Sequence, residues 1–75
     1  MLGYNKSEWK QFSPIEKRIL RLKEQYKMED ERVRMILTFP EPPMLKRTYD
    51  NHLNKISNLI AQIRVNRRQS IEFYG

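Results

Sequence analysis

Several residue types that support specialised chemistry are scarce or missing in this chain. Its 75 residues include no cysteine, one histidine and only two glycines. Without cysteine, a disulfide framework and a thiolate zinc site are excluded, and a reducing compartment is compatible with the sequence. Because the glycines stand at positions 3 and 75, no glycine-rich loop can cradle a phosphate. We expect no cofactor, no small-molecule substrate and a cytoplasmic location.

Motifs for catalysis and for metal binding are also missing. None of the serines at positions 7, 13, 57 and 70 stands in a nucleophile-elbow pattern. A metal site from Glu29, Asp30 and His52 would need scattered ligands without a repeated spacing, which is weak evidence for a metal. The sequence therefore favours a protein that is not an enzyme and holds no metal, with His52 as a structural hydrogen-bond partner of a carboxylate.

Long apolar runs are absent too. No stretch approaches the roughly 20 apolar residues that span a bilayer, and the first residues lack the apolar run of a signal peptide. The composition, 39% hydrophobic and 32% charged, instead suits one helical domain over residues 1–75. A domain of this size buries only about 60% of the surface of its unfolded chain, and without disulfides self-association is the remaining way to add stability.

A first long helix is predicted over about residues 14–38, and a short helical turn can precede it. Ser13 and Glu16 form a capping box around Pro14, which fits the first helical position. The apolar residues that follow recur at helical spacing: Ile15, Ile19, Leu22, Tyr26, Val33 and Ile36. The alternative is a break near Glu29 and Asp30, where an acidic run could open a separate helix. A helix-turn-helix would require that break.

A proline-rich turn over residues 39–43 separates this helix from a second one, predicted over about residues 44–68. Pro40, Pro42 and Pro43 remove backbone donors and fix φ. The second apolar stripe is again at helical spacing: Leu45, Tyr49, His52, Leu53, Ile56, Leu59, Ile60 and Ile63. Basic residues 64, 67 and 68 complement the negative end of the helix dipole before a tail over residues 69–75.

These patterns predict an all-α antiparallel helical hairpin. A fold-back near Glu41 would place Ile19 opposite Ile63, Leu22 opposite Ile60, Tyr26 opposite Ile56, Val33 opposite Tyr49, Ile36 near Leu45, and the carboxylates of Glu29 and Asp30 near His52. Six apolar residues would remain uncovered: Leu20, Met28, Met35, Leu37, Leu53 and Leu59. We expect this face to complete a four-helix bundle in a homodimer, or to bind a different protein.

Charge is concentrated at the open end of this hairpin. Residues 28–59 contain five basic and five acidic residues, whereas residues 1–27 and 60–75 carry the whole net charge of +6. A one-ended positive field attracts polyanions. The predicted anion-binding residues are Lys17, Arg18, Arg21, Arg64, Arg67 and Arg68, with Trp9 and Tyr74 as flanking rings. Alternatively, the cations are only solvated helix faces, and Trp9, Phe12, Phe73 and Tyr74 form an aromatic plug.

We therefore expect a small regulatory or adaptor protein that binds a protein partner within nucleic-acid-handling machinery and contacts DNA or RNA through its basic end. One alternative is a direct DNA- or RNA-binding protein that acts without a protein partner. Another is an inhibitor or scaffold that binds only protein. No zinc-finger, basic-zipper or RNA-recognition motif is present. A basic amphipathic helix on a membrane surface is disfavoured because the second stripe can pack on the first.

Overall fold

The computed structural model describes residues 2–37 and 44–74, and the side chains of 2–37 and 44–69. It confirms the all-α class, with no strand in the described residues. Two short α-helices, α1 (Lys6–Trp9) and α2 (Pro14–Leu20), lead into a π-helical segment η1 (Arg21–Gln25). They are followed by α3 (Asp30–Leu37) and by the long α4 (Lys46–Tyr74). Within the described residues, no helix is both long and apolar enough to cross a membrane.

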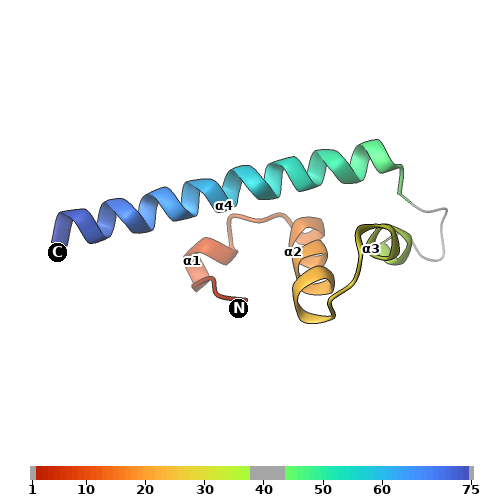
Figure 1. Cartoon of the computed structure of the whole chain (residues 1–75), viewed down its shortest axis with the longest axis horizontal. Coiled ribbons are helices and arrows are strands. Elements are labelled where there is room, and N and C mark those ends of the chain that lie inside the picture. The colour runs from red at the N-terminus through yellow and green to blue at the C-terminus, as the bar shows by residue number, and fades with distance from the viewer. Residues whose placement is uncertain (1, 38–43, 75) are drawn as a thin grey trace.

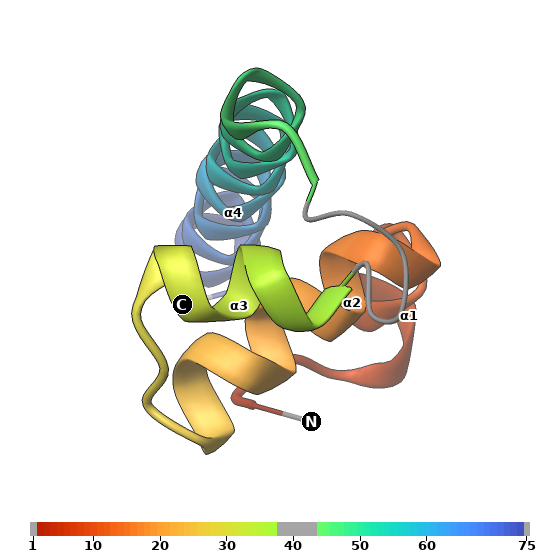
Figure 2. The same ribbon diagram turned by 90° about the vertical axis from the view of Figure 1, so that its right-hand side faces the viewer.

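Helix α4 forms the long axis of the molecule, and the shorter elements cover one side of it (Figure 1). Its 29 residues span about 43 Å at 1.5 Å per residue, close to the longest dimension of 49 Å. A view turned by 90° shows α1, α2 and α3 again on the same side of α4 (Figure 2). The opposite side of α4 is therefore covered by none of these elements.

Two capping boxes fix where the first helices begin. At α2, Glu16 N–H donates to Ser13 Oγ over 3.3 Å, and Ser13 N–H donates to Glu16 Oε2 over 3.1 Å. This predicted box is confirmed. At α1, Glu8 N–H donates to Asn5 Oδ1 over 2.8 Å, and Asn5 N–H donates to Glu8 Oε1 over 3.0 Å. The second box starts the short turn that the sequence allowed before residue 14.

The prediction of one unbroken helix over residues 14–38 is wrong, and the alternative of a break is correct. The chain leaves the helix at Tyr26, and α3 begins at Asp30 with Asp30 and Glu31 in its first turn. Lys27 adopts a left-handed conformation with φ of +54°, and Met28 N–H donates to Leu22 C=O over 3.2 Å. A left-handed residue after a helix reverses the chain even without glycine, at an energetic cost.

The second predicted helix exists but differs at its ends. It begins at Lys46 and continues to Tyr74, so a non-helical tail over residues 69–75 is contradicted as far as residue 74. No glycine or proline occurs between residues 46 and 74, and nothing local stops the helix there. The predicted proline-rich turn over 39–43 lies outside the described residues.

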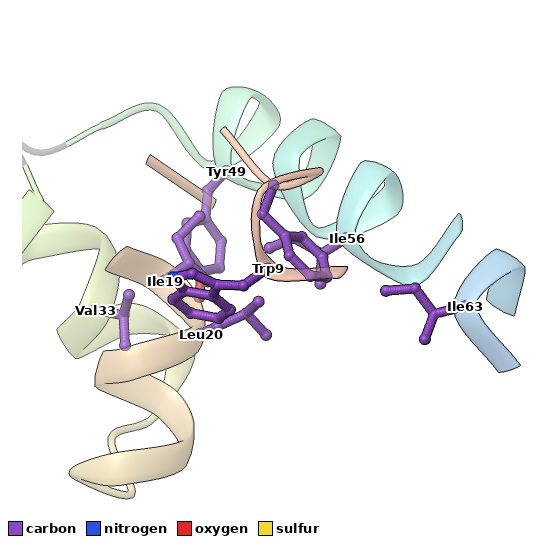
Figure 3. Packing of buried hydrophobic residues seen from close by; sticks show 8 residues of the cluster. Trp9, Ile19, Leu20, Val33, Tyr49, Ile56 and Ile63 are labelled. Atoms are coloured by element: carbon purple, nitrogen blue, oxygen red, sulfur yellow. The ribbon is translucent and has the colours of Figure 1, made fainter. Parts of the chain in front are cut away.

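A small apolar core lies between α4 and the elements beneath it (Figure 3). Helix α4 contributes Tyr49, Ile56 and Ile63, which are seven residues apart and therefore share one face. The other buried apolar residues are Trp9, Phe12, Ile19, Leu20 and Val33. The predicted inward faces of both stripes are thus correct at Ile19, Val33, Tyr49, Ile56 and Ile63.

The detailed hairpin register does not hold. Figure 1 shows α2 crossing α4 instead of running along it, and Tyr26, predicted opposite Ile56, is 61% exposed. The expected hydrogen bond from the His52 ring to a carboxylate is also missing at Nδ1 in the described residues. Asp30 instead accepts from Lys23 and Tyr49, while buried Nδ1 of His52 has no hydrogen-bond partner among the described residues.

Most of the six apolar residues expected on an uncovered face are covered by the chain itself. Leu20 is buried in the core, and four others are partly buried and pack against it: Met28, Leu37, Leu53 and Leu59. Met35 remains exposed, at 54%. The homodimer was expected because these six residues would be left uncovered. Since the short helices pack under α4, this reason now applies only to Met35.

Candidate nucleic-acid interface

Arg67 ties the N-terminal segment to α4. Its Nε donates to Glu8 Oε2 over 2.8 Å, and its Nη2 donates to Glu8 Oε1 over 2.5 Å and to Gly3 C=O over 2.8 Å. The Arg67 hydrogen bonds, together with the Asn5 N–H, lower the pKa of Glu8, and the Glu8 carboxylate raises the pKa of Arg67. The charge of Arg67 is neutralised within the fold, so we remove it from the anion-binding set.

Trp9 also belongs to the fold and not to an exposed surface. It is buried, at 5% exposure, and its ring lies 6.2 Å from Tyr4 and 5.9 Å from Phe12 between centroids. The guanidinium of Arg21 lies 5.6 Å from the centre of the Trp9 ring, a cation–π distance. Trp9 therefore cannot stack on a base without leaving the core. The contact between Trp9 and Phe12 agrees with the alternative in which aromatic residues form a plug. The side chains of Phe73 and Tyr74, which would complete that plug, lie outside the described part.

The remaining predicted cations lie in different places. Arg18 is exposed on α2, and Arg68 is exposed on α4. Arg64 lines a pocket of about 240 Å³ beside the N-terminal segment, whereas Lys17 lines a separate groove near the middle of α4. The structure therefore does not gather the six predicted cations into one cluster.

The groove that includes Lys17 is the most basic concavity described. It has a volume of about 670 Å³ and lies between the α1–α2 connection and the middle of α4. Lysines reach it from three segments: Lys10 follows α1, Lys17 belongs to α2 and Lys55 belongs to α4. The carboxylate among its lining residues, Glu16, is buried and accepts a hydrogen bond in the α2 cap. We call this concavity the basic groove.

A row of amide side chains follows the outer face of α4. It consists of Asn51, Asn54, Asn58, Gln62, Asn66 and Gln69, all exposed, and we call it the amide stripe. Gln62 Nε2 donates to Asn66 Oδ1 over 3.4 Å. No acidic residue occurs in the sequence between Asn51 and Gln69. Our sequence reasoning followed only the apolar and basic residues of this helix and missed the stripe, although its spacing of three and four is visible in the sequence.

The opposite end of the molecule is mixed in charge. A pocket of about 290 Å³ between α3 and α4 is lined by Asp30, Glu31, Arg34, Lys46, Tyr49 and Asp50. Lys23 Nζ, 2.7 Å from Asp30, lowers the pKa of that carboxyl. Burial, followed by the hydrogen bond to Asp30, raises the pKa of Tyr49. In the part of the chain that the structure describes, no three histidine or acidic side chains converge as metal ligands.

Comparisons with known proteins give no relative. No family model matches the chain, and neither the curated proteins nor the solved structures include a significant match. The function must therefore be argued from the surface itself.

Proposed function

We propose that this chain is a small regulatory or adaptor protein without enzymatic activity that binds the phosphate backbone of a nucleic acid through the basic groove. One observation carries the proposal. Lys10, Lys17 and Lys55 line the same groove from separate segments, and the carboxylate beside them is held in a helix cap.

Phosphate is the anion that fits this arrangement best. Lysine acts as a flexible point charge that suits phosphate oxygens, and half to two-thirds of protein–DNA hydrogen bonds go to phosphate and sugar. The chain as a whole carries a charge of +6, which adds long-range attraction for a polyanion. The proposed phosphate site consists of Lys10, Lys17 and Lys55. Arg18, Arg64 and Arg68 are exposed elsewhere on α2 and α4 and add to the overall positive charge.

Binding of the full chain to labelled DNA and RNA, measured by fluorescence anisotropy across a salt series, tests this function. We expect affinity to fall steeply with salt because neutralised phosphates release counterions. In the variant Lys10→Gln/Lys17→Gln/Lys55→Gln, the slope of log K against log salt should become shallower by about 2 to 3, since each phosphate contact contributes about 0.9 on duplex DNA.

A variant with the same change in net charge serves as the control. Lys6→Gln/Arg32→Gln/Lys46→Gln removes three exposed cations that do not line the basic groove. Its affinity should fall less and its salt slope should change little. Equal losses in the two variants, or no binding by the unmodified protein at low salt, would refute the proposed function.

A second candidate function is binding of a protein partner or of a second copy of the chain. It is favoured by the three most exposed large apolar side chains of the described residues: Tyr26 at 61%, Met35 at 54% and Leu45 at 73%. Sedimentation equilibrium tests the homodimer. A dimer should have about twice the chain mass of 9.2 kDa and dissociate in the Met35→Glu/Leu45→Glu variant. A single 9.2 kDa species at every concentration contradicts self-association.

A further inference from the structure

The outer face of α4 carries amide side chains at positions where an exposed helix surface commonly carries charged ones. The six amides of the stripe are spaced by three and four residues and so lie on one face. Asn58 is about 200° around the helix axis from the buried Ile56, at 100° per residue. A solvated face commonly alternates glutamate with lysine or arginine. Here the same positions carry neutral groups that both donate and accept hydrogen bonds.

This face is also accessible along its length. Figures 1 and 2 show the other described elements along one side of α4, and the buried residues among the described side chains of α4 are Tyr49, Ile56 and Ile63. Every residue of the stripe is exposed. An α-helix with its side chains is about 10–12 Å across, and the major groove of B-form DNA is about 12 Å wide. A helix that is covered on one side only can enter such a groove with its other side.

The stripe adjoins the proposed phosphate site. Asn58 belongs to the stripe and lines the basic groove together with Lys55. A backbone held by Lys10 and Lys17 would therefore run beside the middle of the stripe. Phosphate contacts fix the orientation of a protein on duplex DNA, and side chains next to them then reach the base edges.

The chemistry of the stripe favours base edges over a protein surface. Asparagine and glutamine can form two hydrogen bonds with adenine N6 and N7 in the major groove. The centres of protein–protein interfaces are instead enriched in aromatic residues, methionine and arginine. The stripe contains none of these, and the large apolar side chain exposed on this side of α4, within the side chains described, is Val65, at 47%.

Helix α3 is a poorer candidate for base contact, although it follows the turn of a helix-turn-helix arrangement. In such motifs the N-terminal residues of the second helix contact the bases. The first turn of α3 contains Asp30 and Glu31, and both side chains are exposed. The charge of Glu31 would repel the phosphates on either side of the groove, whereas that of Asp30 is offset by Lys23.

From these observations we propose that the amide stripe of α4 reads base edges in the major groove of duplex DNA, with the basic groove holding the adjacent phosphate backbone. The inference rests on the proposed function and makes it more specific. Duplex DNA is favoured over duplex RNA because the A-form major groove is too deep and narrow for side chains to read.

Selection from a DNA duplex library with a randomised centre tests the proposal with the full chain. The unmodified protein should enrich a defined, adenine-containing sequence and bind it more tightly than scrambled duplex DNA, duplex RNA or single-stranded DNA of equal length. Asn54→Ala/Gln62→Ala/Asn66→Ala leaves the groove-lining Asn58 in place and should lose the preference, with affinity for the selected site falling roughly 5- to 150-fold for each base contact removed. Its binding to scrambled duplex should change little.

The stripe variant is not expected to unfold, because alanine has a higher helix propensity than asparagine or glutamine. Gln25→Ala removes an exposed amide outside the stripe and should leave the preference intact. Enrichment of no sequence, a preference for RNA or single strands, or an unchanged preference in the stripe variant would each overturn the inference. Salt-dependent binding that still requires the basic-groove lysines would then leave the proposed function standing.

Discussion

Lys27 is a single residue whose backbone sets the path between two elements. Its φ of +54° costs a non-glycine residue about 1–2 kcal/mol, while glycine there would lose about 0.5–1 kcal/mol more chain entropy on folding. Lys27→Gly should therefore raise the free energy of unfolding by up to about 1 kcal/mol, as measured by urea denaturation. Arg32→Gly, inside α3, should lower it by about 1 kcal/mol. Losses in both variants would contradict a left-handed Lys27.

Individual long-range contacts were the part least accessible from the sequence. The positive charge at the open end places Arg67 among the predicted anion-binding residues, but Glu8, 59 residues away, neutralises it. No local sequence pattern around either residue predicts that ion pair. Asn5 and Glu8, by contrast, have the spacing of a capping box, and that local signal was available.

At the scale of elements, the two faces of α4 should respond very differently to the same kind of truncation. Ile56 is 5% exposed and packs in the core, whereas Val65 is 47% exposed. Ile56→Ala should lower the free energy of unfolding by about 2–5 kcal/mol through lost burial and a residual cavity. Val65→Ala should change it by no more than about 0.5 kcal/mol. Thermal denaturation followed by circular dichroism distinguishes the two variants. A large loss of stability in Val65→Ala would contradict the assignment of the Val65 face as the exposed one.

Elements with strong local signals were predicted well, and those set by tertiary packing were not. The cap at Ser13 and the inward face of α4 follow from spacing alone. The break at Tyr26–Glu29 has no glycine or proline to mark it, and its one local signal is the acidic run that begins at Glu29. Once the break exists, α2 can cross α4, and the apolar residues assigned to an uncovered face become covered. The spacing of the amide stripe is visible in the sequence. Its exposure depends on where the other helices pack, and spacing alone does not predict that.

At the scale of the whole molecule, two ion pairs join different helical elements and depend on ionised carboxylates. Glu8 pairs with Arg67, and Asp30 pairs with Lys23. The pKa of each carboxyl is lowered from its ordinary value, 4.5 for Glu8 and 3.8 for Asp30. A lowered folded-state pKa stabilises the fold above the ordinary value, and this stabilisation is lost as pH falls through the folded-state pKa.

Acid should therefore destabilise this protein by two routes at once. As pH falls below 4.5 and then through the lowered folded-state pKa values of Glu8 and Asp30, both pairs lose their negative partner. Protonation of all nine Asp and Glu side chains would leave the charge of the 15 Lys and Arg residues unopposed. We expect Tm to fall steeply below pH 4.5. Glu8→Gln/Asp30→Asn should have a lower Tm at neutral pH and a flatter profile in acid. The control Glu24→Gln/Asp50→Asn alters two exposed carboxylates outside these pairs and should retain the steep fall, so identical profiles for the two variants would exclude the pairs as its cause.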